Sequence, residues 1–287
     1  MSKRRVVVTG LGIVSPLGND LASSWDGIVN GRSGIAGVTH FDASAMATRI
    51  AGEVKGFDPL AWISPTDVKK MDAFIHYGVA ASLMAMRDAG LEVNEANAER
   101  IGAMIGSGIG GILGIEEQTI KYHEGGPRKI SPFYIPSTII NMLPGQISLM
   151  TGIQGPNFSA VSACASSNHS IGIAMRMIQY GDADAMIAGG AERGSSPTSI
   201  GGFCAMKAMS TRNDEPARAS RPWDRDRDGF VMGDGAGILV IEEYEFAKAR
   251  GARIYCELLG FGAGADAFHM TAPSENGDGP ARSMKTA

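Results

Sequence analysis

Cys164 is the residue of this sequence best placed to act as a nucleophile. It lies in the segment Ser162–Ser167, where a predicted strand of small residues turns directly into an amphipathic helix. Free N–H groups and the dipole at a helix N-terminus stabilise a thiolate, and small neighbours leave room for a substrate. A lone cysteine is more often a small buried hydrophobe, and we interpret Cys204 and Cys256, which lack this context, as packing residues.

A nucleophilic cysteine usually works with a histidine, and the sequence offers five. His169 follows Cys164 by five positions, about 140° around a helix, so we expect it to be structural. His269, in the irregular polar stretch Asp266–Pro273, is the best remaining candidate for a site residue. The other histidines are expected to be surface or packing residues: His40, His76 and His123.

The glycine-rich stretch Gly106–Gly111 fits the dinucleotide-binding pattern G-x-G-x-x-G. A true fingerprint also places an acidic residue about twenty positions on, at the end of the next strand. Glu124 lies at a suitable distance but in a predicted loop. The pattern therefore indicates close approach of the backbone to a neighbouring element rather than a cofactor site.

The pattern of the surrounding sequence predicts an α/β fold for the elements that position these residues. Short apolar runs ending in glycine alternate with longer periodic segments. One helix is expected to begin at Ser64-Pro65, to carry apolar residues from Val68 to Met86 on one face, and to end at Gly90. Two further helices are predicted over 115–123 and 165–180, with Gly181 ending the second. Strands are predicted over 5–9, 101–105, 158–163, 185–188, 238–242 and, less regularly, within 253–262, and a last helix is expected to begin near Gly279.

Charge and composition exclude several classes of protein. With 26 basic and 30 acidic side chains the chain has no polybasic footprint for nucleic acid or an anionic membrane. The charge run Arg212–Asp228 holds five arginines and five acids, which favours an internally paired, solvated loop over a ligand site. No apolar stretch is long enough to span a membrane, and the N-terminus does not read as a secretion signal. Three cysteines without paired spacing argue against disulfides and a zinc or other metal site, so we expect a cytoplasmic protein.

Several motifs in chain order resemble the N-terminal two-thirds of the β-ketoacyl-acyl-carrier-protein synthases, in particular the type II elongating condensing enzymes of bacterial fatty acid synthesis. The stretches that carry the resemblance are Val7–Gly12, Lys70–Phe74, Gly106–Gly111, Gly126–Phe133, Ser162–Cys164, Ala188–Glu192 and Ser220–Asp224. The resemblance implies a thiolase fold with layers α-β-α-β-α, built from two similar halves and assembled as a homodimer. Residues 1–250 would form the half that carries the nucleophile, and residues 251–287 would begin the second half.

The resemblance also implies a decarboxylative Claisen condensation. The Cys164 thiolate would accept an acyl chain from the phosphopantetheine arm of an acyl carrier protein, and malonyl-carrier protein would lose its carboxylate and attack the resulting thioester. The backbone N–H of Cys164 would contribute to the oxyanion hole. No cofactor of the protein's own is implied, since the partner protein carries the phosphopantetheine.

The resemblance assigns further residues to the site. Ile109 and Phe203 would line the acyl channel, and Phe133 and Tyr134 would close its far end from the partner subunit. His269 and Thr271 would lie at the substrate entrance. A basic patch would dock the acidic carrier protein through Lys69, Lys70, Arg128, Lys129 and Lys207. The family usually has arginine at the last of these positions, so the charge is kept but the bidentate geometry is not.

The sequence departs from the family in its second half. The family's two catalytic histidines lie in Asn-Ala-His-Gly-Thr and Gly-His-x-x-Gly-Ala-Ala-Gly, and neither motif occurs here. These histidines stabilise the enolate that forms on decarboxylation. We therefore expect a fragment of a condensing enzyme. Two alternatives stay open, namely a non-condensing partner that only binds or is acylated, and a degradative thiolase acting on coenzyme A, which would need a second catalytic cysteine.

Overall fold

The computed structural model describes residues 3–287 and is built around a sheet in the order β5-β4-β6-β7-β1-β8. Its strands are β1 (Val6–Val14), β4 (Ile101–Gly106), β5 (Asn157–Phe158), β6 (Ala185–Glu192), β7 (Gly235–Glu243) and β8 (Cys256–Leu258). β4 runs parallel to both β5 and β6, whereas β7 and β8 pair antiparallel with their neighbours. The sheet is therefore mixed. Cys164 follows β5, which belongs to the parallel part of the sheet.

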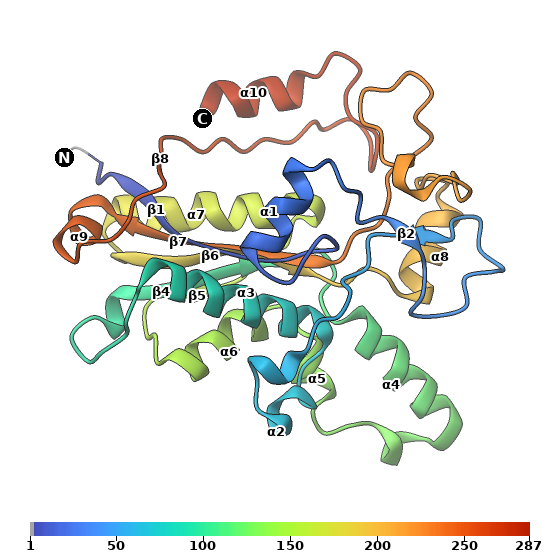
Figure 1. Ribbon diagram of the computed structural model, residues 1–287, viewed down its shortest axis with the longest axis horizontal. Helices are drawn as coiled ribbons and strands as arrows, with labels where there is room; N and C mark the ends of the chain where they lie inside the picture. The colour runs from blue at the N-terminus through green and yellow to red at the C-terminus, as the bar shows by residue number, and fades with distance from the viewer. Residues whose placement is uncertain (1–2) are drawn as a thin grey trace.

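Helices cover both faces of this sheet (Figure 1). α7 (Ser166–Tyr180) lies on one face, and α3 (Ala73–Ala89) and α6 (Met142–Thr151) lie on the other. The remaining helices are α1 (Leu21–Val29), α2 (Pro65–Val68), α4 (Ile112–Gly125), α5 (Tyr134–Thr138), α8 (Pro197–Ala205), α9 (Tyr244–Ala249) and α10 (Asp278–Thr286), and a small hairpin joins β2 (Ala36–Gly37) to β3 (Ile50–Ala51). Each sheet face buries its own apolar cluster, centred on α3 or α7.

The glycines of β1 allow α3 to pack directly on the strand. A Cβ at Gly10 would lie 2.1 Å from the carbonyl oxygen of Ala85, and one at Gly12 would lie 1.9 Å from that of Ala81. These distances are far below van der Waals contact, so only glycine fits at either position. The glycines that follow the first predicted strand thus continue β1 to Val14 rather than ending it.

The structure corrects two predicted elements near the site. The single helix expected from Ser64 to Gly90 is wrong, because the chain turns between α2 and α3. Asp72 takes extended backbone angles there and caps α3 by accepting from Phe74 N. The strand expected over 158–163 is also wrong, since β5 ends at Phe158 and the chain then bends toward Cys164.

The end of the chain is only partly regular. Within 253–262 only β8 forms, on the edge of the sheet beside β1. The segment 259–277 has no helix or strand, and its beginning lies between α7 and α10 (Figure 1). Phe261 packs its ring edge-to-face on His169 of α7, with 6.0 Å between the ring centroids. The last helix, expected near Gly279, is α10.

Candidate active site

Cys164 lies in the tight turn Ala163–Ala165, immediately before α7, and its side chain is exposed. Ser166 fastens this turn, because its Oγ accepts from Ser162 N at 2.9 Å and donates to Ala163 O at 2.7 Å. Among the described residues, no side chain caps the N-terminus of α7. Ala165 N and Ser166 N donate within the turn, to Ser162 O and Ala163 O. Because no described side chain takes the remaining donors of the helix start, they are left for groups at or near the cysteine, as the sequence predicts for a nucleophile.

The residue before the cysteine has a strained backbone. Ala163 has a φ of 50°, in the left-handed region that residues other than glycine rarely adopt. Such positions cost about 1–3 kcal/mol and are kept where the surroundings enforce them, often at functional sites. Here the bonds of Ser166 hold the turn, which keeps Cys164 at the start of α7 with its side chain exposed.

Cys164 opens into a largely apolar cavity of about 660 Å³. The structure brings Ile109, from the loop after β4, and Phe203, from α8, into the lining of this cavity. Phe203 also packs edge-to-face on Phe230, with ring centroids 5.1 Å apart. Three of the residues that the sequence assigned to the acyl site, Cys164, Ile109 and Phe203, therefore share one cavity.

The glycine-rich loop after β4 is organised by an internal carboxylate. Glu192, the last residue of β6, accepts from Gly108 N at 2.6 Å, Ile109 N at 2.9 Å and Gly110 N at 3.1 Å, and also from Ser107 Oγ at 3.0 Å. These donors are the groups that would bind a phosphate in a dinucleotide site, and here they are occupied. The loop therefore lies close to a neighbouring element, the end of β6, as its glycines indicate.

Phe133 and Tyr134 line a separate cavity of about 400 Å³, together with Lys69, Asp72 and Arg193. The structure thus separates them from the Cys164 cavity of the same chain. Burial raises the pKa of Asp72, whose carboxylate also accepts from Gly114 N at 2.8 Å and so ties α3 to α4.

His269 and Thr271 lie in the irregular segment 259–277, are exposed, and do not line the Cys164 cavity. His269 Nδ1 accepts from Thr271 N at 3.1 Å and from Ala272 N at 3.0 Å, so the ring organises its own loop. His169 has a structural partner, as expected, because its Nδ1 lies 2.6 Å from Ser162 Oγ.

The remaining histidines divide between interior and surface. His76 lies 3.0 Å from Val68 O through its Nε2, and burial lowers its pKa. His40 lies against Ser195 and Glu53, and His123 is exposed on α4.

The interpretation of the two other cysteines is half correct. Cys204 is partly buried and packs against the cluster that contains Ile200 and Met209. Cys256, expected to be a packing residue, is exposed. The expectation fails because β8 is an edge strand of only three residues, which leaves the Cys256 side chain open to solvent.

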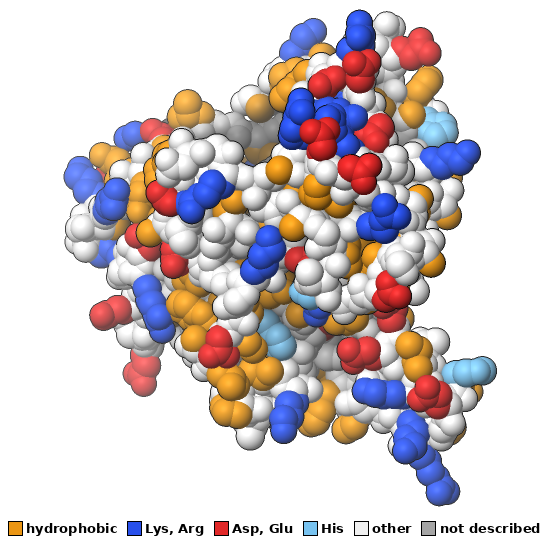
Figure 2. All heavy atoms as spheres, turned by 45° about the vertical axis from the view of Figure 1, so that its right-hand side comes forward, with side chains coloured by type: hydrophobic (Ala, Val, Ile, Leu, Met, Phe, Trp, Pro, Cys, Tyr) orange, Lys and Arg blue, Asp and Glu red, His pale blue; other side chains and the backbone are white. Residues whose placement is uncertain are grey.

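Four of the five residues assigned to a basic docking patch are exposed: Lys69, Arg128, Lys129 and Lys207. Lys70 is partly buried and pairs with Asp67 at 2.7 Å. α4 and the turn after it project at the lower right of Figure 1, and Figure 2 shows Lys and Arg side chains gathered at the tip of this projection. These four cations are therefore accessible to a partner.

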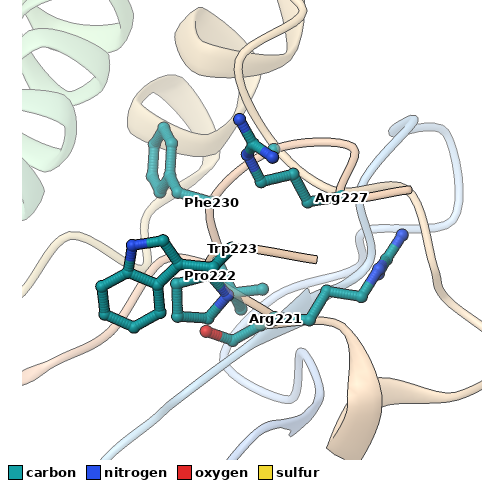
Figure 3. Close-up of a pocket in the computed structure, with 8 residues that line it drawn as sticks. Arg221, Pro222, Trp223, Arg227 and Phe230 are labelled. Carbon is teal, nitrogen blue, oxygen red and sulfur yellow. The ribbon is translucent and has the colours of Figure 1, made fainter. Parts of the chain in front are cut away.

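The charge run 212–228 forms an internally paired loop, as predicted. Glu215 pairs with Arg212 and Arg218, and Arg221 pairs with Asp228 at 3.1 Å. This loop borders a hollow of about 770 Å³ beside Trp223, whose side chain is 92% exposed (Figure 3). The hollow is lined by Arg221, Pro222, Trp223, Arg227 and Phe230, among others.

Two further acids line the cavity, Glu192 and Asp234, and neither is among the site residues predicted from the sequence. Asp234 is buried, which raises its pKa, and it accepts from both the backbone N and the hydroxyl of Ser195. The available signal was an acid at the end of a glycine-rich buried strand, for Glu192, and an acid between two glycines, for Asp234. In the described residues, no group of three or more His, Cys, Asp or Glu side chains is arranged to hold a metal ion.

Comparisons with known proteins identify the family of this chain. The family model "Beta-ketoacyl synthase, N-terminal domain" matches residues 3–247. The chain is 60% identical over its full length to "3-oxoacyl-[acyl-carrier-protein] synthase 2" of Vibrio cholerae and 52% identical to the protein of that name in Coxiella burnetii, in each case covering 69% of the relative. The chain therefore belongs to the β-ketoacyl synthase family.

Solved structures place the fold in the same family. A β-ketoacyl synthase from Burkholderia phymatum matches with a TM-score of 0.88 at 35% identity, over 99% of this chain and 69% of that one. A type II PKS acyl-carrier protein in complex with its ketosynthase matches with a TM-score of 0.86 at 34% identity and the same coverage. The thiolase-like α/β fold predicted from the motifs is confirmed. In the described residues, no helix is both long and apolar enough to cross a membrane.

Proposed function

We propose that this chain carries the acyl-accepting site of a 3-oxoacyl-[acyl-carrier-protein] synthase of fatty acid elongation. Cys164 Sγ, as thiolate, attacks the thioester carbonyl of an acyl carrier protein, and the phosphopantetheine thiolate leaves and takes up a proton. Malonyl-carrier protein then loses carbon dioxide, and its carbanion attacks the new thioester and releases the cysteine thiolate. The observation that carries the proposal is Cys164 at an uncapped helix start, facing a cavity of about 660 Å³.

The cavity suits an acyl chain because its walls are mostly apolar and Cys164 lies among its lining residues. Developing negative charge on the thioester oxygen needs donors, and the backbone N–H of Cys164, at the start of α7, is the donor that we propose for it. The names of the relatives support the same reaction class. The proposed chemistry uses no cofactor held by the protein, since the carrier brings the phosphopantetheine.

The proposed partner is an acyl carrier protein that docks on the exposed cations around Lys69, Arg128 and Lys207. The matched complex of a ketosynthase with an acyl-carrier protein supports a partner of this kind. Charge complementarity steers such an encounter even though the whole chain is slightly acidic. We place the reaction in the cytoplasm, because the cysteines of the sequence have no paired spacing. We propose no nucleic-acid or membrane partner.

We further propose a homodimer formed along the β5 edge of the sheet. β5 is the terminal strand, and Phe158 and Val161 beside it are 54% and 60% exposed. Exposed apolar side chains also lie on α5 at Ile135 and α6 at Leu149. An uncovered strand edge flanked by apolar groups favours pairing with a second copy. In this arrangement Phe133 and Tyr134 would reach the partner's acyl cavity. Light scattering of Phe158→Lys should show a smaller mass than the wild type.

The experiment that tests the function is intact-mass spectrometry after incubation with an acyl-carrier thioester, followed by malonyl-carrier protein. We expect an acyl adduct that is lost in Cys164→Ala and kept in Cys204→Ala. Ketoacyl product would support full condensation, and an adduct without product would support the alternative of acylation alone. Adduct formation from coenzyme A thioesters but not from carrier thioesters would contradict the proposed substrate class.

A further inference from the structure

We propose that Glu192 is a positioning residue that fixes the wall of the acyl cavity and thereby sets which acyl chain lengths Cys164 accepts. Its carboxylate holds four consecutive residues of the loop after β4, from Ser107 to Gly110. This inference rests on the proposed function and deepens it, because it concerns the substrate range of the same site.

The hydrogen bonds of Glu192 saturate its carboxylate. Oε2 accepts from Gly108 N and Ile109 N, and Oε1 accepts from Ser107 Oγ and Gly110 N. An ionised carboxylate offers about four lone-pair sites, so all of them are used within the protein. Because bonds to an ionised acceptor are the strong ones, the loop is held more firmly than its glycine content alone would allow.

These four hydrogen bonds, here called the Glu192 clamp, explain why two positions of the loop are glycine. A Cβ at Gly108 would lie 2.9 Å from Glu192 Oε2, and Gly110 has a φ of 80°. The first glycine admits the carboxylate, and the second lets the chain curl so that three successive N–H groups converge on it.

Ile109 connects the clamp to the cavity. Its backbone N–H binds Glu192, while the residue itself lines the cavity that contains Cys164. Glu192 lines the same cavity, from the strand on the other side of the loop. Fixing the Ile109 backbone therefore fixes the position of an apolar wall. In an apolar pocket one methylene more or less changes selectivity by about 10–200-fold, so a loosened wall must reduce discrimination between lengths.

The test uses Glu192→Gln, which keeps the shape of the side chain but replaces one acceptor oxygen by an NH₂ donor facing backbone N–H groups. Two reagents separate this inference from the proposed function. Acyl-carrier thioesters of short, medium and long chains report transfer, whereas N-alkyl iodoacetamides of matching lengths alkylate Cys164 without any transferase activity. Peptide mass mapping gives the rate at Cys164, and the exposed Cys256 in the same molecule gives the reference rate.

For the wild type we expect a steep dependence of Cys164 alkylation on chain length, and for Glu192→Gln a ratio between favoured and disfavoured lengths that falls by about tenfold. Ile109→Ala should lower the ratio in the same way, and adding Glu192→Gln to it should change little further, since both act on one wall. The profile at Cys256 should stay unchanged in all variants.

The matched control is Glu53→Gln, because Glu53 is also a buried carboxylate that accepts from backbone N–H groups and a hydroxyl, at Thr39 and His40, but it does not line the cavity. An unchanged length ratio in Glu192→Gln, an equal change in Glu53→Gln, or a wild type that alkylates at all lengths alike would each overturn the inference. Length-dependent alkylation without any acyl transfer would instead overturn the proposed function and leave the role of Glu192 in shaping the cavity supported.

Discussion

Two loops of this protein occupy similar places in the fold but differ in how their backbone N–H groups are used. Both lead from the parallel part of the sheet into a helix: Gly106–Gly111 joins β4 to α4, and Ser159–Ala165 joins β5 to α7. In the first loop Glu192 occupies the N–H groups and makes a wall. In the second loop no described side chain caps the helix, and Cys164 lies there. Backbone donors in a loop that leads into a helix are thus available for chemistry only where no side chain of the protein occupies them.

Straining the second loop should give the largest effect. Ala163→Val places a β-branched residue at a φ of 50°, which we expect to lower the free energy of unfolding by about 3 kcal/mol and to slow acylation of Cys164 at least about tenfold. Urea unfolding and intact-mass kinetics measure the two effects. Ala163→Gly, which tolerates this φ, should keep the acylation rate. Equal behaviour of the two variants would show that the turn is not strained.

Crowding the first loop should have a smaller effect. In Gly111→Ala the new Cβ would lie 2.5 Å from Thr138 Cα on α5, so backbone must move. We expect a loss of about 2 kcal/mol in the free energy of unfolding, measured by urea titration. Because Gly111 donates its N–H to Thr138 O rather than to Glu192, the Cys164 turn should be unaffected. A larger loss of acylation than in Ala163→Val would reverse the comparison.

The carboxylate that holds α4 should give a pH-dependent effect. Burial raises the pKa of Asp72 in the folded protein above its ordinary value of 3.8. At pH values between the unfolded and the folded pKa, the folded protein therefore binds more protons than the unfolded chain. The contribution of Asp72 to the free energy of unfolding should therefore fall as the pH rises through that window. Asp72→Asn should remove this decline, as urea unfolding at a series of pH values can test. A steeper decline in the variant would contradict the assignment.

The smallest effect is expected where neither loop is touched. Gly201 lies inside α8, and a Cβ there would have no atom within 4 Å. Gly201→Ala should raise the free energy of unfolding by about 0.5–1 kcal/mol, because alanine loses less backbone freedom in a helix. Thermal unfolding measures the gain. A loss of stability would show that α8 needs the freedom of this glycine.

The parts of the fold that could be predicted are those with a strong local signal. β4, β6 and α7 follow from buried apolar runs and from periodicity that ends at Gly181. The break between α2 and α3 was not predicted, because Met71 continues the apolar face across it. Asp72 caps α3 there by accepting from Phe74 N and is held by the tertiary bond that it accepts from Gly114 N. The short length of β5 likewise follows from its pairing, because only Asn157 and Phe158 are in register with β4, which spacing does not reveal.

The candidate site divides in the same way. Cys164 could be predicted because its chemistry depends on the local strand-to-helix turn. Glu192 could not be assigned, because its partners lie more than eighty positions away in the sequence and meet it only when β4 and β6 pair. Ile109 and Phe203 came from family resemblance, and the structure then brought them to one cavity.

The end of β6 ties three distant segments together. Glu192 holds the loop at Gly108, Arg193 donates to His40, and Ser195 donates to the buried Asp234. These attachments follow one another within a few residues of a single strand. Opening of this end of β6 should therefore release all three segments together, so hydrogen exchange at the amides of Gly108 and Ser195 should report the same free energy of opening.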